Sequence, residues 1–264
     1  MRAVRYGTVN LLRLAGFAFV GLVIAALGLT LALGRFDDFQ AYAYNAFDQR
    51  LADAGMAPRI VDLVGAEHVD AQTIAFAIDA DPGRSLMAID PHAARANVEA
   101  LGWVETASVS RLWPDRVSVV VTEREPFALW QLDGAFRVID RSGVVIEPAQ
   151  AVDYADLPRV VGEGAAEHAS AILSLVARQP EIAALTTHAV RVGERRWNLR
   201  LEAGGDILLP EDDPASALAT IAALHEDRGV LHLDAAAFDI RTDGRLVIRA
   251  WPDRAEAARG EREA

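Results

Sequence analysis

Hydrophobic and polar positions alternate most clearly between residues 103 and 130. The runs on either side of Trp113-Pro114-Asp115 are rich in β-branched residues, which is typical of strands. Proline fixes φ at a value that suits a turn, and aspartate is favoured beside it. The pattern therefore predicts a β-hairpin, and Pro126 ends its second strand because proline lacks a backbone N–H.

Upstream of this hairpin the pattern predicts one strand and two helices. The strand is Ile60–Val64, ended by Gly65. Asp70 and Asp90 are N-cap candidates, and apolar residues recur at helical spacing after each of them. With the hairpin, the order is β-α-α-β-β, which predicts two helices on one face of a small three-stranded sheet.

After Pro126 the pattern predicts short strands separated by turn residues. Two segments with helical spacing interrupt these strands. We expect strands near residues 127–132, 136–140, 144–146, 158–161, 189–192, 197–203, 207–209, 238–241 and 246–250. Helices are expected near 166–178, ending before Pro180, and near 214–225. The fold class is α+β: an N-terminal transmembrane helix, the β-α-α-β-β domain, and a mixed β domain with flanking helices.

Residues 14–34 contain no charged side chain. As a helix this run would span roughly 31 Å, enough for the hydrocarbon core of a bilayer. Three arginines precede it and Asp37 and Asp38 follow, so we expect a cytoplasmic N-terminus and an exported remainder. The alternative is a signal peptide cleaved after Gly34, but signal h-regions run about 7–15 residues, which favours the anchor.

Between residues 35 and 58, Phe36, Phe39, Ala43 and Phe47 recur at helical spacing. Two interpretations stay open for this segment. It is an aromatic-rich helix at the outer membrane–water interface, or a solvated stalk whose aromatic side chains face a partner or the next domain.

Composition excludes several functions. Net charge is −12, and the 26 basic residues are all arginine; the part after residue 34 has 23 arginines and 38 acidic residues. A domain this acidic is a poor nucleic-acid binder. Cysteine is absent, the six histidines show no metal-binding spacing, and no nucleophile elbow or phosphate-binding loop occurs. His225 and His232 bracket a predicted helix end and a loop, where we expect them at the surface. We expect no catalysis, no cofactor and no metal.

The most specific motif runs from the hairpin into the next domain. It reads Trp103…Arg111-x-Trp113-Pro114-Asp115…Glu123-x-x-Pro126-x-Ala128-x-Trp130, followed by Val138-Ile-Asp140-x-x-Gly143, Leu157-Pro158, Arg195-Arg196-Trp197 and Phe238-Asp239-Ile240-Arg241. These collinear segments resemble the FtsQ/DivIB family of bitopic bacterial cell-division proteins. The β-α-α-β-β part resembles the POTRA domain of that family.

The resemblance implies a non-enzymatic scaffold of the division septum in the cell inner membrane, single-pass, with its bulk in the periplasm. Its implied partners are FtsB and FtsL, with FtsK, FtsW and FtsI as further candidates. The implied organisation is a cytoplasmic tail 1–13, a transmembrane helix 14–34, a juxtamembrane segment 35–58, a POTRA domain 59–125, a C-terminal β domain 126–251 and a disordered tail 252–264. The alternatives are an outer-membrane transport component with POTRA domains and a membrane-anchored cell-wall hydrolase.

The resemblance also assigns two partner-binding surfaces. In the C-terminal domain an FtsB segment is expected to add a strand beside the last strand, with Arg241 facing an acidic partner residue; the assigned residues are Arg195, Arg241, Thr242, Asp243, Gly244, Arg245, Leu246, Val247, Ile248 and Arg249. The family's side chains differ at 242–244, which leaves the individual contacts there open. The alternative is a sheet that simply ends, its edge protected by arginines.

In the POTRA domain the assigned residues are Thr106, Val109 and Arg111, on a strand that we expect at a sheet edge. The alternative makes Val109 a core residue and Arg111 a solvated charge. The remaining motif residues are expected to be structural: Trp103, Trp113, Pro114, Asp115, Glu123, Pro126 and Trp130. Trp113, Trp130 and Trp197 are expected to be partly buried packing residues. Tryptophans can instead be interface hot spots, and Glu123 can orient the two domains.

Overall fold

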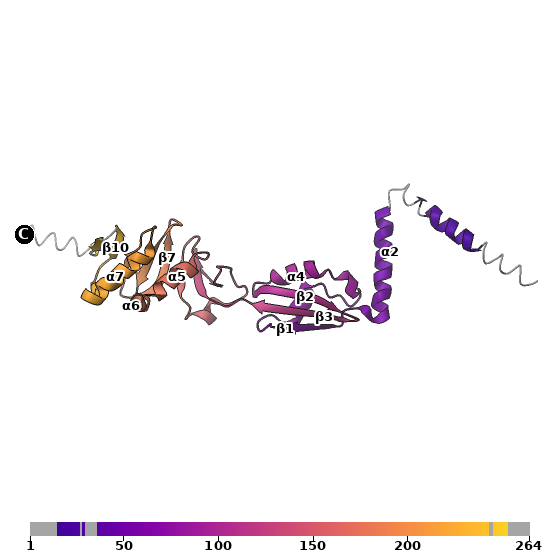
Figure 1. Cartoon of the computed structure of the whole chain (residues 1–264), viewed down its shortest axis with the longest axis horizontal. Helices are drawn as coiled ribbons and strands as arrows, with labels where there is room; N and C mark the ends of the chain where they lie inside the picture. Colours follow the sequence, from indigo (N-terminus) through magenta and orange to yellow (C-terminus); the bar gives the residue numbers. More distant parts are fainter. Residues whose placement is uncertain (1–14, 27, 30–35, 243–244, 253–264) are drawn as a thin grey trace, which may run out of the picture. The chain divides into compact units, whose positions relative to one another are not determined.

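The computed structural model describes residues 15–26, 28–29, 36–242 and 245–252 (Figure 1). They divide into two compact units. The first contains the chain up to Val98 and Ala107–Val121, and the second contains Glu99–Thr106 and the chain from Thr122 onward.

Residues 15–26 and 28–29 are helical. Of the residues that the structure describes, none belong to a helix both long enough and apolar enough to cross a bilayer. The expected tail 1–13, part of the expected span 14–34, and all but one residue of the expected tail 252–264 lie outside the described residues.

Helix α2 (Phe36–Leu51) follows, with a short π-helical segment, Ala52–Met56, after it. Its aromatic side chains are largely exposed, including Tyr42 at 73% and Phe47 at 59%. Near its C-terminal end Asp48 is buried. Its carboxylate accepts hydrogen bonds from the backbone N–H and the hydroxyl of Ser85, which ties α2 to the rest of the first unit.

The expected β-α-α-β-β order is confirmed. Its elements are β1 (Ile60–Val64), α3 (Ala71–Ala77), α4 (Pro91–Glu99), β2 (Val104–Leu112) and β3 (Arg116–Glu123), with a 3-10 turn, Leu86–Ala88, between the helices. The sheet order is β1-β3-β2, with β1 and β3 parallel. Asp70 caps α3 as expected, because its side chain accepts hydrogen bonds from the backbone of Gln72 and Thr73.

An eight-stranded mixed sheet forms the C-terminal domain, in the order β11-β10-β9-β8-β7-β6-β4-β5. Its strands are β4 (Ala128–Leu132), β5 (Ala135–Ile139), β6 (Arg159–Val161), β7 (Thr186–Val192), β8 (Arg196–Leu201), β9 (Asp206–Leu208), β10 (Ala237–Thr242) and β11 (Arg245–Arg249). The pairs β4–β6, β6–β7 and β9–β10 are parallel, and the others are antiparallel.

Three helices pack on this sheet: α5 (Ala169–Ala177), α6 (Pro180–Leu185) and α7 (Pro214–Arg228). Ile172, Ile182 and Ile221 from the helices share one core with Leu199 and Phe238 from the sheet. Because strand side chains alternate, the neighbours of these sheet residues point to the opposite face. Charged side chains lie on this opposite face of the sheet.

The sequence expectations need correction in three places. Pro180 does not only end one helix; it is the first residue of α6, where its missing N–H is harmless. Residues 144–146 form a single bridge, Ile139 to Val145, and not a strand. His225 was expected at the surface but is buried, with its Nδ1 accepting a hydrogen bond from the backbone N–H of Leu231.

Candidate partner-binding surfaces

The last strand, β11, lies at one end of the eight-stranded sheet. Among the described residues its ladder partner is β10, in antiparallel register with Phe238 opposite Ile248 and Asp239 opposite Val247. Four of its five residues are exposed, and Leu246 packs against the core. Val247 and Ile248 remain 44% and 41% exposed, which is high for large apolar side chains.

Arg241 does not stand free at the surface. Its Nε and Nη2 donate to the two carboxylate oxygens of Asp239 at 2.7 and 2.6 Å, in a bidentate pair. Arg249 donates to the same carboxylate from the neighbouring strand. The two guanidinium groups therefore flank one internal acid, whose side chain is only 12% exposed.

These contacts change the protonation of Asp239. Hydrogen bonding from Arg241 is the main reason that the pKa of Asp239 is lowered, and burial opposes this shift. The carboxylate thus stays ionised well below neutral pH.

Arg195 lies near the same region. A hollow of about 580 Å³ is lined by Arg195, Arg196, Pro210, Glu211, Asp212, Arg241 and Thr242. The structure thus brings Arg195 and Arg241 to one hollow, although they are 46 positions apart in the sequence. Arg195 is paired with Glu211 at 3.6 Å, and both side chains are more than half exposed. Asp243 and Gly244 lie outside the described residues, and Thr242 and Arg245 are exposed.

The three residues assigned in the POTRA domain all lie on β2, which is at the edge of its sheet. Thr106 is exposed and Val109 is half-buried. Because side chains alternate along a strand, Thr106 faces opposite to Val109 and Arg111. Arg111 is not a solvated charge, since its Nη1 donates to the carbonyl oxygen of Ile89 at 3.3 Å.

The motif tryptophans differ in burial. Trp103 is 7% exposed, and the half-buried Trp130 donates from Nε1 to the carbonyl oxygen of Gly162 at 2.9 Å. Trp113, which follows β2 directly, is 56% exposed, so the burial expected of it is wrong. Asp115 accepts from the backbone N–H groups of Arg59 and Ile60 through its carbonyl oxygen.

Sequence reasoning noted Asp140 only as part of a motif, but it is the centre of a buried polar network. Its carboxylate accepts from Arg124 Nη1 at 2.6 Å, from the backbone N–H groups of Ser142 and Val144, and from the Ser142 hydroxyl. Burial is the largest influence on its pKa and raises it, but these hydrogen bonds together outweigh burial and lower the pKa. The network fixes the turn after β5.

Two family models match the chain: "POTRA domain, FtsQ-type" over residues 56–124, and "Cell division protein FtsQ/DivIB, C-terminal" over residues 128–241. The two domains described above are therefore an FtsQ-type POTRA domain and the C-terminal domain that follows it in that family. These define the class: a bacterial cell-division protein with a POTRA domain.

Similar proteins include three named "Cell division protein FtsQ". The protein of Bradyrhizobium diazoefficiens is 38% identical over 85% of this chain and 66% of its own length; that of Rhizobium meliloti is 36% identical over 76% and 65%. That of Caulobacter vibrioides is 36% identical over 85% of this chain and 76% of its own length. The chain spans about two-thirds of the length of the first two. It belongs to the FtsQ/DivIB family of cell-division proteins.

Proposed function

We propose that this protein is a non-enzymatic scaffold of the division machinery, held in the cytoplasmic membrane by residues 14–34. Its exported part comprises a POTRA domain, 59–125, and a C-terminal domain, 126–251, which recruit other division proteins to the septum. The proposed partners are FtsB and FtsL, with FtsK, FtsW and FtsI as further candidates. Membership of the family supports this role, and the partner contacts are argued below.

The observation that supports partner binding most strongly is the free side of β11. An edge strand presents unpaired N–H and C=O groups, and an extended segment of another chain can pair with them. The edge of β11 is short and its side chains are exposed, so a partner strand meets no covering element within the described part of the chain. We assign an FtsB segment to this edge.

Arg241 and Arg249 would meet such a segment with Asp239 already between them. An arginine has five N–H donors, so a guanidinium bound to one carboxylate can still donate to a second. Arg195, across the hollow, is the more accessible cation, since 61% of its side chain is exposed. We therefore expect Arg195 to contribute more to affinity for an acidic partner residue than Arg241 does.

The first test replaces the central residue of β11, as Val247→Pro, in the full-length protein. Proline disrupts a strand because it lacks an N–H and fixes φ. We expect co-purification with the FtsB–FtsL complex to be abolished. The matched control is Arg137→Pro, the central residue of β5, the strand at the opposite edge of the same sheet. Unchanged binding by the β11 variant, or equal loss in both variants, would contradict the assignment.

A second test uses the absence of cysteine from this chain. Single cysteines at 245, 247 and 249 each provide the chain's one thiol, to be paired with a cysteine scan along FtsB. Strand pairing predicts disulfides that shift along FtsB in step with the position in β11, because paired residues keep a fixed register. A helical or side-chain-only contact would give no such regular shift.

Because the chain has no cysteine of its own, single introduced cysteines can also test the membrane topology. Cysteines at Thr8 and at Ala54, which is exposed, should differ in intact spheroplasts, with only position 54 labelled by a membrane-impermeant maleimide. Both should be labelled after detergent is added. Labelling of position 8 in intact spheroplasts would contradict the proposed topology.

A further inference from the structure

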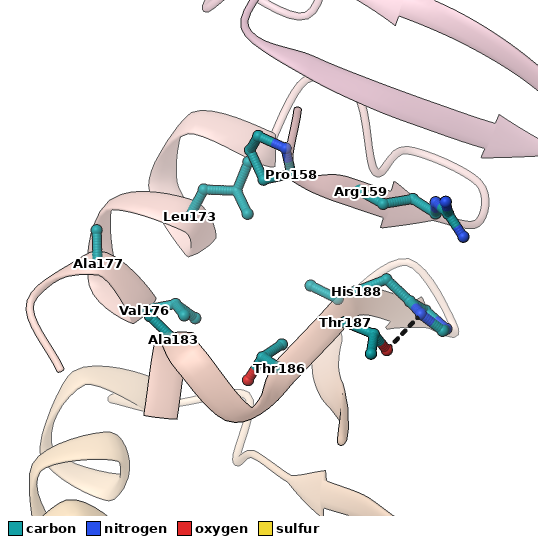
Figure 2. A pocket seen from close by; sticks show the side chains of 10 residues that line it. Pro158, Arg159, Leu173, Val176, Ala177, Ala183, Thr186, Thr187 and His188 are labelled. Carbon is teal, nitrogen blue, oxygen red and sulfur yellow. Dashed lines mark hydrogen bonds between the residues drawn. The ribbon is translucent and has the colours of Figure 1, made fainter. Parts of the chain in front are cut away.

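The C-terminal domain has a second hollow, away from β11, where the parallel pairing of β6 and β7 begins (Figure 2). It has a volume of about 220 Å³. Leu173, Val176, Ala177 and Ala183 from α5 and α6 lie on one side, and Arg159 and His188 lie on the other, with their side chains extending away from these helices. In the sheet order, β10, β9 and β8 separate β7 from β11.

The register of three neighbouring strands places basic side chains next to one another beside this hollow. Arg159 is opposite His188, and His188 is opposite Arg200, so the three residues occupy one row on neighbouring strands about 4.8 Å apart. Arg200 is paired with Asp206 at 2.7 Å. Arg159 stacks on the Phe136 ring at 5.0 Å, and its buried Nε has no hydrogen-bond partner within the described part of the chain.

The hydrogen bonds of His188 leave one of its nitrogens available. The Thr187 hydroxyl donates its only proton to the carbonyl oxygen of Arg200, so its 3.0 Å contact with Nδ1 requires a proton on Nδ1. Nε2 is then the nitrogen that gains a proton on acidification. Burial, Arg159 and Arg200 lower the pKa of His188, against the opposing effect of Asp206 on β9.

We propose that this hollow binds a short acidic segment of a partner protein, with one apolar side chain against α5 and α6 and carboxylates at Arg159 and His188. The volume is below the roughly 300–1,000 Å³ that encloses a whole small ligand, and it suits a single side chain. Charge complementarity favours an acidic occupant, since Arg159 has no ion-pair partner among the described residues. The contact is independent of strand addition at β11.

The test uses the full-length protein in phosphatidylcholine nanodiscs and a fluorescein-labelled peptide, acetyl-Glu-Asp-Leu-Asp-Glu-amide, followed by fluorescence anisotropy. We expect saturable binding that weakens about tenfold or more with Arg159→Gln plus His188→Asn, because charge-assisted hydrogen bonds are lost. Ala177→Trp fills the hollow without removing a charge and should weaken binding as well. Arg228→Gln, an exposed arginine on α7, is the control and should change nothing.

Two further readouts separate the parts of the proposal. Because the pKa of His188 is lowered, binding should tighten only as the pH falls below the ordinary histidine value of about 6.5, and His188→Asn alone should remove that dependence. A peptide with Gln and Asn in place of its acids, or with Ala in place of Leu, should bind more weakly. Val247→Pro should leave peptide binding unchanged, which separates this site from the one at β11.

Several outcomes would overturn the proposal. They are no saturable peptide binding, equal binding by the Arg159 and His188 double variant with an unchanged urea-unfolding midpoint, or no effect of Ala177→Trp. Binding of phosphatidylglycerol vesicles through Arg159 and His188, without peptide binding, would identify an anionic membrane surface as the occupant and would equally overturn it.

Discussion

Single carboxylates determine much of the local order in the C-terminal domain. Asp140 holds the turn after β5 and neutralises Arg124, whose side chain is only 15% exposed. Removing one partner of such a pair leaves the other charge buried without compensation, which is costly. The two residues are 16 positions apart, so this pairing was not visible in the sequence pattern.

For Asp140→Asn we expect a loss of about 2–4 kcal/mol in the free energy of unfolding, measured by urea denaturation of the full-length protein in detergent. The control is Asp227→Asn. Asp227 is also ion-paired to an arginine, but both side chains are about 70% exposed, and such pairs contribute little. Similar effects of both substitutions would contradict the network's role.

Acid should destabilise the protein through the same groups. The pKa values of Asp140 and Asp239 are lowered in the folded state, so their stabilisation is fully present above the unfolded-state pKa of about 3.9. It is lost as the pH falls below that value and through the folded-state pKa. Unfolding free energy measured against pH should therefore drop on the acid side, and Asp140→Asn should make that drop shallower.

At the scale of elements, the sequence predicts what depends on neighbours in the chain. The hairpin around Trp113, the Asp70 cap and the β-α-α-β-β order follow from local patterns. It does not predict that β6 pairs in parallel with both β4 and β7, because those partners lie far along the chain. Helix α6 was missed because a proline both stops one helix and begins the next.

The candidate surfaces also include some features that the local sequence predicts and others that depend on strands far apart in the chain. The position of β11 at a sheet edge was expected from its place at the end of the pattern. Asp239 and Arg241 are two residues apart on an expected strand, so alternation alone puts them on one face and the sequence does carry this signal. The row of Arg159, His188 and Arg200 depends on register between three strands and has no local signature.

Two turns offer a direct comparison between two glycines with the same φ. Gly205, after β8, and Gly134, between β4 and β5, both have φ near +80°. A Cβ at Gly205 would lie 2.3 Å from the carbonyl oxygen of Ala235, whereas a Cβ at Gly134 would meet nothing within 4 Å.

We therefore expect Gly134→Ala to cost about 1 kcal/mol, from backbone strain alone. Gly205→Ala should cost at least about 2 kcal/mol more, since Ala235 must move. Thermal unfolding of the two variants measures the difference. Equal melting temperatures would show that the backbone at Ala235 yields without strain.

At the scale of the whole molecule, the two units differ in the size of their sheets. The POTRA domain has a three-stranded sheet, and the C-terminal domain has eight strands with helices packed against them. The larger sheet offers both an edge, at β11, and a charged row on the face away from the shared core. The two binding surfaces that we propose for this domain thus differ chemically: β11 offers backbone N–H and C=O groups, and the row offers side-chain charge.

The internal carboxylate between Arg241 and Arg249 has a consequence for selectivity. Asp239 already occupies the position between Arg241 and Arg249 that the carboxylate of a partner would take, so other anions must compete with it for these two arginines. A lone carboxylate in solution should therefore gain little binding free energy at these two arginines. In the proposed complex, a partner segment that pairs with β11 would gain backbone hydrogen bonds as well, and these would hold its acidic side chain close enough to share the two guanidinium groups.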